Sequence, residues 1–568
     1  MKTINYLQLS TSDKPLEEIP LQEYPRPQLV RDSYINLNGK WDLATSSCKE
    51  IPSHFDKKII VPYCIESNLS RINYCYPSTT YYFYKKEFSL TKDFIKDKVL
   101  LHLDSVDQEC EVYINGTKVG ENIGGYIPFE IEIQDYIKIE ESNTLIVVVK
   151  DTLNHDYPWG KQRKDRQGMW YTPVSGIWKT VWLESVSNDY IKSLKIETSL
   201  KDVTIKINSD AKNKKITIHT PTRDIIRRIS TDSITISIPN PILWDLDNPH
   251  LYYFDVETDN DKVTSYFGLR TFTFKVKNGH QYFALNNKPT FIHGLLDQGY
   301  FPDGIYTPRS YEEYSKDILR MKELGFNTLR KHIKIEPLYF YYLCDKYGML
   351  VAQDFVNNGG YNYIRDTVLP TIRINIPEWM LSKSKKARKI FYEQMDKTVD
   401  LLYNSTSLFM WTIYNEAWGQ NNPDAAYKKL KLLDSTRIID TTSGWFKRKE
   451  SDVDSLHIYF RPVKCKASDK PLFLSEFGGF VYKIKEHSFN QDKTYGYRFY
   501  ETAEDYQNAI TTLYLDQIVP SIKEGLIGAI YTQVSDVEDE TNGLLTYDRK
   551  ICKVNKEKML EIADKLKI

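Results

Sequence analysis

Two glutamates end two apolar segments that lie sixty residues apart. Residues 408–414 are apolar and β-branched, the composition of a strand buried on both faces, and they lead directly into Asn415 and Glu416. Residues 471–475 follow the same plan and lead into Glu476. An ionised carboxylate is costly at the tip of a buried strand unless it is paired, so its placement favours a function over a solvated loop residue. Hydrolysis of a glycosidic bond is the chemistry that most often needs two such carboxylates.

Strand-like and helix-like segments alternate over residues 276–568. Helical spacing of apolar residues over 311–324, ended by Gly325, is typical of a helix that lies between two such strands. The alternation predicts a (β/α)8 TIM barrel, whose active site lies at the carboxyl ends of the strands. The eight candidate strands are 290–295, 327–333, 349–355, 408–416, 438–443, 454–459, 472–477 and 527–534. Glu416 then ends the fourth strand and Glu476 the seventh.

Other polar and aromatic residues follow the same strand ends. Each of them alone could cap a helix or face solvent in a loop, and that alternative stays open for Asp354 in particular. Together they are difficult to explain as stability features, because this end of a barrel carries the active site. We therefore predict that they contact the substrate beside Asn415. The candidates are Asp297, His332, Asp354, Trp445, His457 and Tyr459.

Two β-rich regions precede the barrel. Residues 1–185 carry many short strands with turn signals between them, among them the hairpin pair Asn115-Gly116, and this pattern predicts a β-sandwich of the jelly-roll kind. Residues 186–275 alternate between apolar and polar with period two, which indicates half-buried antiparallel strands. The length of this second region suits an immunoglobulin-like sandwich. The sequence thus predicts a multidomain chain with its chemistry in the third part.

The overall composition excludes several classes of function. The 76 basic residues balance the 76 acidic ones, so no charge footprint for nucleic acid or an anionic membrane is present. No stretch approaches the roughly 18 apolar residues of a membrane span. The first residues lack an apolar signal region, which predicts a cytoplasmic protein. Seven scattered cysteines without a CxxC pair argue against a zinc site and a disulfide framework.

The motifs around both glutamates resemble those of glycoside hydrolase family 2, the β-galactosidase and β-glucuronidase family. Asn415-Glu416 is similar to its acid/base motif, and Ser475-Glu476-Phe477-Gly478 to its nucleophile motif. The resemblance implies a jelly-roll sugar-binding-like domain, whose aromatic residues we expect in its core, then an immunoglobulin-like domain and a catalytic barrel. Further sequence motifs resemble those of the family's first two domains and occur in the order in which the family has them, at 36–41, 61–63, 112–116, 175–182, 241–252 and 267–270.

The resemblance also implies roles for four residues. Glu476 would attack the anomeric carbon as nucleophile, while Glu416 would act first as general acid and then as general base, which gives retaining hydrolysis. Asn415 would bind the 2-hydroxyl of the sugar, and Tyr459 would donate a hydrogen bond to Glu476. No step of this mechanism needs a metal or another cofactor.

A charged loop, residues 159–170, precedes the Ser-Gly-Ile motif at 175–177. In the family this loop reaches the barrel and helps line the substrate pocket, so Asp165 is a further substrate-binding candidate. A solvated charged loop is an equal alternative. The expected partners are a carbohydrate substrate, without nucleic acid or membrane, and a second copy of the chain, since family members commonly assemble.

The sugar is much less determined by the sequence. After residue 534 the chain reads Asn542-Gly543-Leu544, where glucuronidases of the family carry an Asn-x-Lys pair, and this difference disfavours a glucuronide. We take an exo-acting β-galactosidase as the leading expectation, because it is the commonest activity. Departures at 533–534 and 295–300 keep an arabinoside, a mannoside or a glucuronide open. A catalytically inactive carbohydrate-binding protein is the alternative from another class, and the two intact glutamates favour the enzyme.

Overall fold

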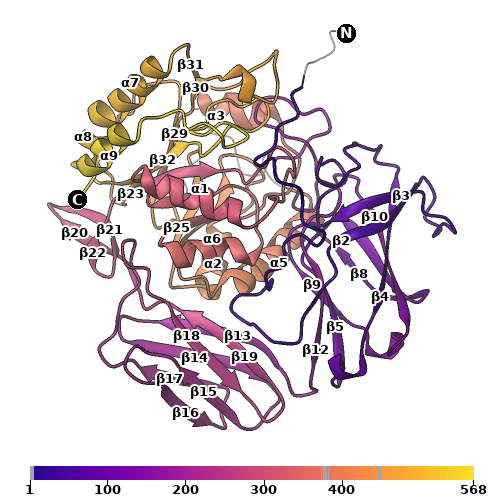
Figure 1. Cartoon of the computed structure of the whole chain (residues 1–568). Coiled ribbons are helices and arrows are strands. Elements are labelled where there is room, and N and C mark those ends of the chain that lie inside the picture. Colours follow the sequence, from indigo (N-terminus) through magenta and orange to yellow (C-terminus); the bar gives the residue numbers. More distant parts are fainter. Residues whose placement is uncertain (1–5, 373, 375–379, 381–382, 446–448) are drawn as a thin grey trace.

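The computed structural model describes residues 6–372, 374, 380, 383–445 and 449–568. A β-sandwich at the N-terminus is followed by a smaller sandwich and then by a barrel of parallel strands that contains the C-terminus (Figure 1). This order confirms the fold class expected from the sequence. Within the described residues, no helix has both the length and the apolar character that crossing a membrane requires.

The N-terminal sandwich packs a six-stranded sheet against a four-stranded one. Every second residue of β7 is buried, because one face of the strand covers the apolar core. Asn115 and Gly116 have φ values of 50° and 84°, as both central residues of the predicted hairpin turn require. The strands are β1 Ile35–Asn36, β2 Gly39–Ser46, β3 Lys57–Val61, β4 Tyr81–Ser89, β5 Lys98–Leu103, β6 Val106–Asp107, β7 Glu109–Ile114, β8 Thr117–Ile123, β9 Phe129–Glu132, β10 Ser142–Lys150, β11 Gly176–Ile177 and β12 Val181–Val186.

The second sandwich has a three-stranded and a four-stranded antiparallel sheet around its own apolar core. The alternation seen in the sequence is the alternation of burial along β14, whose apolar residues face the core. A three-stranded hairpin sheet leads from it to the barrel. The strands are β13 Ile191–Thr198, β14 Asp202–Ser209, β15 Lys214–Ile218, β16 Ile225–Ile229, β17 Ser233–Ser237, β18 Tyr252–Glu257, β19 Lys262–Phe267, β20 Phe272–Lys277, β21 His280–Leu285 and β22 Lys288–Pro289.

The third part contains an eight-stranded parallel sheet in the described residues. Its order, β27-β26-β25-β24-β23-β32-β29-β28, follows the chain around a ring, and β32 pairs with β23. A short parallel pair, β30 and β31, lies outside this ring. The strands are β23 Ile292–Asp297, β24 Thr328–Lys331, β25 Leu350–Asp354, β26 Leu408–Asn415, β27 Ile438–Ser443, β28 Asp454–Ile458, β29 Leu472–Gly478, β30 Phe480–Tyr482, β31 Arg498–Tyr500 and β32 Leu526–Thr532.

Helices lie between and around these strands (Figure 1). The α-helices are α1 Glu312–Glu323, α2 Leu338–Tyr347, α3 Leu369–Thr371, α5 Lys385–Leu402, α6 Pro423–Leu433, α7 Ala503–Leu513, α8 Val519–Ile522 and α9 Lys556–Lys565. The 3-10 helices are η1 Lys92–Phe94, η2 Gln134–Tyr136 and η4 Lys485–His487. The π-helical segments are η3 Ile364–Val368 and η5 Tyr514–Ile518.

All eight predicted barrel strands occur in the predicted order, with ends that differ by no more than two residues. The clearest case is β26, which is buried along its whole length, as its unbroken apolar composition indicates. The helix predicted over 311–324 is α1, which buries Tyr314, Ile318 and Met321 on one face. Gly325 follows it with φ of 85°, a conformation that glycine adopts without a Cβ penalty.

One loop of the N-terminal sandwich, residues 159–172, lies against the barrel end that carries the glutamates; we call it the docking loop. The rings of Trp159 and Trp418 are 4.9 Å apart between centroids, and Trp418 is two residues beyond Glu416. Trp159 Nε1 also donates to the carbonyl of Gly359 at 3.1 Å. The hydroxyl of Tyr171 donates to Glu540, which lies beyond β32. The N-terminal domain therefore takes part in building this end of the barrel.

Candidate active site

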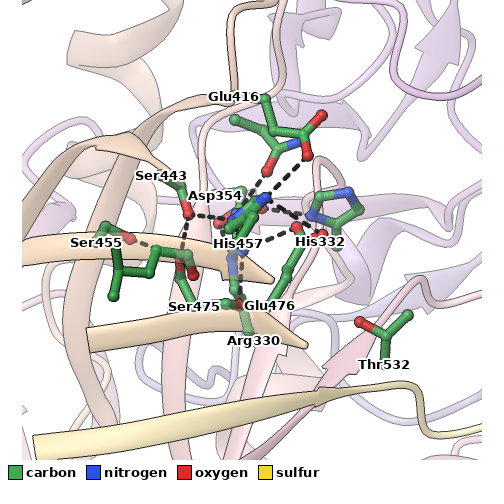
Figure 2. Close-up of polar contacts among 12 residues, drawn as sticks. Arg330, His332, Asp354, Glu416, Ser443, Ser455, His457, Ser475, Glu476 and Thr532 are labelled. Atoms are coloured by element: carbon green, nitrogen blue, oxygen red, sulfur yellow. Dashed lines mark hydrogen bonds and ion pairs between the residues drawn. The ribbon is translucent and has the colours of Figure 1, made fainter. Parts of the chain in front are cut away.

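Glu416 and Glu476 come together at the carboxyl ends of the barrel strands (Figure 2). Glu416 follows β26 directly, and Glu476 is the fifth residue of β29. Glu416 has φ of 55°, and its N–H donates to the carbonyl of Ser443 at 2.8 Å. A left-handed backbone at a residue other than glycine persists where the surroundings enforce it, and such residues cluster at functional sites.

Glu476 is held by three side chains. Arg330 Nη1 donates to its Oε1 at 3.0 Å, and the hydroxyl of Tyr459 donates to its Oε2 at 2.5 Å. His457 Nδ1 is 3.5 Å from the same Oε2. Burial alone would raise the pKa of Glu476, but the charges of His457 and Arg330 outweigh it and lower that pKa to about 2. Glu476 is therefore a carboxylate at neutral pH.

The pKa of Glu416 is shifted in the opposite direction, upward. Burial raises its pKa above the ordinary value, and the nearby charge of Glu476 adds to this effect, while a hydrogen bond with His457 opposes it. That bond joins Glu416 Oε1 to His457 Nδ1 at 2.9 Å. The side chain of Glu416 is 17% exposed against 7% for Glu476, so it is the more accessible of the two. The environment thus separates one carboxyl group that holds a proton more readily from one that is ionised.

Arg330 is the centre of the hydrogen-bond network beneath the two glutamates. It is completely buried, and its Nε and Nη2 bind the two oxygens of Asp354 at 2.9 and 3.0 Å. Its Nη2 also donates to Asn415 Oδ1 at 2.9 Å. His332 Nδ1 lies 2.7 Å from the same Asp354, which orients this imidazole ring. One arginine on β24 therefore fixes groups from three other strands.

A row of serines supports His457 from behind. His457 Nε2 is 3.0 Å from Ser443 Oγ, which in turn lies 2.9 Å from Ser475 Oγ (Figure 2). Ser455 Oγ lies 2.5 Å from that same Ser475 hydroxyl. These contacts hold the imidazole so that Nδ1 faces both glutamates. Among the described residues, Glu416, His457 and Glu476 also form the one group of side chains whose ligand atoms are close enough together to hold a metal ion.

The structure gathers most of the side chains predicted for the site. His332, Asp354, His457 and Tyr459 all belong to the network around the two glutamates. The ring of Trp445 is 6.2 Å from that of His457, between centroids, at the edge of the same cluster.

Two predicted residues lie elsewhere. Asp297 pairs with Lys331 at 2.7 Å in a separate network that includes Glu336. Asp165 is at the surface, with 69% of its side chain exposed, and pairs with Arg163 of the same loop. The docking loop does reach the barrel as expected, but it presents other residues there.

Sequence reasoning did not assign Arg330, Lys161 or Glu540 to the site. For Arg330 a signal existed, since an arginine inside an apolar strand needs buried partners. For Glu540 the signal was an acid-rich segment, residues 535–543, that follows the eighth strand at the rim of the expected pocket. For Lys161 no local signal exists, because its position depends on how the docking loop meets the barrel.

The three parts of the chain match three family models in order. The model for "Glycosyl hydrolases family 2, sugar binding domain" matches residues 25–186. The model for "Glycosyl hydrolases family 2" matches residues 180–270, and that for "Glycosyl hydrolases family 2, TIM barrel domain" matches residues 274–557.

Curated relatives show the same likeness at low identity. The β-galactosidase of Thermoanaerobacter pseudethanolicus is 26% identical over 460 residues, which are 73% of this chain and 58% of the relative. A β-galactosidase of Bacteroides ovatus is 25% identical over 418 residues, 66% of this chain and 44% of the relative. The chain thus spans about half the length of the curated relatives it matches.

Solved structures share the whole fold. The β-D-glucuronidase of Dictyoglomus thermophilum superposes with a TM-score of 0.73 at 20% identity, covering 96% of this chain and 98% of that one. A β-galacturonidase from Eisenbergiella tayi gives a TM-score of 0.67 at 16% identity, covering 96% and 98%. With the barrel model spanning half of its residues and two further models matching the sandwiches, the chain belongs to glycoside hydrolase family 2.

Proposed function

We propose that the protein is a retaining, exo-acting glycoside hydrolase, with Glu476 as nucleophile and Glu416 as general acid and base. The observation that supports this most is the approach of the two carboxyl groups: an oxygen of Glu416 and an oxygen of Glu476 lie within 4.8 Å of each other. Retaining enzymes hold these groups about 5–5.5 Å apart, whereas inverting enzymes leave about 6.5–9.5 Å for a water molecule. Family membership supports the same class of reaction.

In the first step, the Glu476 carboxylate attacks the anomeric carbon and the bond from that carbon to the leaving oxygen breaks. Protonated Glu416 gives its proton to the leaving oxygen. The product of this step is an ester between the sugar and Glu476, and Glu416 is left as a carboxylate. The opposite pKa shifts of the two groups give each the protonation state that this step needs.

In the second step, Glu416 takes a proton from a water molecule whose oxygen attacks the anomeric carbon. The ester bond to Glu476 breaks, so Glu476 returns as a carboxylate and Glu416 returns protonated. Two inversions at the same carbon give net retention of configuration. A short separation of the carboxyl groups permits both steps without movement of the backbone.

Neighbouring side chains orient the reacting groups in this scheme. Arg330 holds Asn415 Oδ1, which leaves the amide N–H groups of Asn415 as the donors for the 2-hydroxyl of the sugar. Tyr459 fixes the rotamer of Glu476 through its short hydrogen bond. His332 and Trp445 complete the set of groups that we assign to substrate binding.

For the sugar, we propose a terminal β-galactoside-like residue. Several curated relatives are named β-galactosidase and two, from Formosa agariphila, putative β-glucuronidase, while the solved structures of similar fold are named for uronide hydrolases. The absence of an Asn-x-Lys pair in 540–544 favours the first group. Another neutral glycoside, such as an arabinoside or a mannoside, is the second candidate.

A panel of p-nitrophenyl glycosides tests the reaction. We expect wild type to hydrolyse at least one of them, and Glu476→Gln and Glu416→Gln each to lose at least about 10³-fold in kcat, the scale for losing a catalytic group. NMR of the first-formed sugar should show the configuration of the substrate. Full activity of Glu476→Gln, or an inverted product, would refute the mechanism. Sugar binding by wild type without turnover of any glycoside would instead favour a carbohydrate-binding protein.

A further inference from the structure

Glu540, a buried carboxylate near the catalytic pair, has one oxygen without a partner among the residues that the structure describes. Only 4% of the residue is exposed. Its Oε2 accepts hydrogen bonds from the Tyr171 hydroxyl and, at 3.2 Å, from Gln533 Nε2. Its Oε1 makes no hydrogen bond within the described residues. This oxygen is not fully enclosed by the protein. Because this oxygen is not fully enclosed, a donor from outside the chain, such as a sugar hydroxyl or a water molecule, can reach it.

Lys161 of the docking loop lies on the same side of the site. Its carbonyl accepts from the N–H of Tyr171 at 2.9 Å, which ties its backbone to the residue that binds Glu540. Its neighbour Gly160 packs so closely on the barrel that a Cβ there would lie 3.4 Å from the carbonyl oxygen of Ile333, next to His332. Within the described chain, the ammonium group of Lys161 forms no salt bridge.

Electrostatics agree with this placement. Burial raises the pKa of Glu540, and Lys161 is the largest influence that lowers it. Lys161 also lowers the pKa values of Glu416 and Glu476, where burial and His457 are the larger influences. One ammonium group therefore acts on all three carboxylates.

We propose that Glu540 and Lys161 select a neutral terminal sugar, with Glu540 Oε1 accepting from one of its hydroxyl groups and Lys161 Nζ donating to another. This inference rests on the proposed hydrolysis at Glu416 and Glu476, and it names the class of sugar that this site takes. Tyr171 and Gln533 already hold the Glu540 carboxyl group in place, so it loses little conformational freedom on binding.

On this proposal the pair favours a neutral sugar over a charged one. A uronate whose carboxylate faced Glu540 would have no proton to donate there at neutral pH, and it would bring a second negative charge beside a buried carboxylate. An amino sugar could donate to Glu540, but its ammonium group would meet Lys161. Hydroxyl groups can both donate to Glu540 and accept from Lys161, so a neutral sugar satisfies the two residues without adding charge to a site that already holds three carboxyl groups.

Three single variants test the selection. Glu540→Gln and Lys161→Gln should each lower kcat/KM for the best neutral p-nitrophenyl glycoside roughly 10- to 100-fold, the range for one hydrogen bond to a charged group. Glu540→Gln should also raise the ratio of uronide to neutral-glycoside kcat/KM, because it removes the repelling charge, and Lys161→Gln should lower that ratio. Lys164→Gln is the matched control: the same change on the same loop at an exposed lysine, with wild-type kinetics expected.

The outcomes separate this inference from the proposed reaction. Unfolding midpoints equal to wild type would show that the losses come from recognition. If turnover depends on Glu476 but wild type prefers a uronide or an amino sugar, the selection is overturned while the reaction stands. The same holds if both variants behave like Lys164→Gln. Activity that survives Glu476→Gln would overturn both.

Discussion

Among the described residues, His457 is the one side chain that contacts both glutamates, with Nδ1 at 2.9 Å from Glu416 and 3.5 Å from Glu476. It opposes the rise in the pKa of Glu416 that burial causes, and it is the largest influence that lowers the pKa of Glu476. We therefore treat it as a positioning residue that sets the two protonation states, and its removal should be visible in the pH dependence of the reaction.

His457→Asn should move both limbs of the pH profile of kcat/KM upward. The acidic limb reports Glu476, whose pKa would lose its main lowering charge, and the basic limb reports Glu416, whose pKa would rise without the hydrogen bond. A loss of roughly 10- to 100-fold in kcat/KM at neutral pH should accompany the shift. The control is His293→Asn, which removes another buried imidazole, bonded to the Gly325 carbonyl, and should leave both limbs in place. Unmoved limbs in His457→Asn would contradict the assigned role.

Tyr459→Phe should lower kcat by roughly 10- to 100-fold, since its hydroxyl donates to Glu476 at 2.5 Å and holds this proposed nucleophile in position. Tyr282→Phe removes a comparable buried hydroxyl, bonded to the Ile522 carbonyl at 2.7 Å, outside the site. Steady-state kinetics and thermal unfolding of both variants separate the two effects. Equal kcat in both variants would mean that Tyr459 contributes only to stability.

At the scale of the elements, the strand ends decide which side chains meet. β27 ends at Ser443, and the chain then turns through Gly444, which has φ of 87°. A Cβ at this glycine would lie 2.2 Å from Cγ of His457. The absence of a side chain at this turn is therefore what lets the imidazole lie between the two strands that carry the glutamates.

Gly444→Ala should displace the His457 ring and lower kcat/KM by at least about 10-fold, because a displacement of about 1 Å in the groups that orient the reacting atoms is already costly. Gly116→Ala is its matched control, since φ is 84° there and nothing lies within 4 Å of the added Cβ. Both variants carry the same backbone strain, and only Gly444→Ala adds the overlap with His457, so the kinetic loss is expected in Gly444→Ala alone. Wild-type kinetics in Gly444→Ala would show that the ring tolerates the added methyl group.

Local patterns in the sequence were sufficient to predict the helices and strands of the barrel. The strand β26 and the helix α1 were predicted because burial leaves a different pattern of apolar residues in each: an unbroken apolar run in the strand and apolar residues three to four positions apart in the helix. The two glutamates were found for the same reason, as charges at the ends of apolar runs. Asp297 and Asp165 show that such patterns do not predict which partner a side chain has. A residue at a strand end or in a charged loop can turn to a local partner, as these two do with Lys331 and Arg163.

At the scale of the whole molecule, a buried cluster of charges joins the two sandwiches. Arg31 binds Glu184 of the first sandwich at 2.9 Å and Asp261 of the second at 2.9 Å. Glu184 also pairs with Arg26 at 2.6 Å. Burial would raise the pKa of Glu184, but Arg26, His102 and Arg31 outweigh it and lower that pKa well below its usual range. Because breaking such a cluster leaves a buried charge without a partner, it fixes the domains to one another.

Glu184→Gln should lower the free energy of unfolding at pH 7 by about 3–5 kcal/mol, the range for breaking a buried ion pair. A carboxyl group whose folded pKa is lowered stabilises the protein above the ordinary glutamate value of about 4.3, and this stabilisation is lost as pH falls below it. The gap between wild type and Glu184→Gln should therefore shrink below about pH 4. Urea unfolding followed by circular dichroism measures it.

Glu132→Gln serves as the control for that series, because Glu132 is 50% exposed and pairs with Lys98 at the surface. Its effect should stay near or below about 0.5 kcal/mol at every pH. A gap for Glu184→Gln that is independent of pH would mean that its effect comes from packing and not from the charge.

The sequence by itself determined the strands, the helices, the order of the three parts and the two glutamates, because each of these leaves a pattern within a short stretch of chain. Only the tertiary structure decided that Arg330 holds Asn415 and Glu476 together, and that His457 lies between the glutamates. It also decided that the docking loop, which belongs to another domain, lies against the barrel end that carries the glutamates. Contacts of this kind join residues hundreds of positions apart, and their distances follow from how the domains pack, which no local pattern encodes.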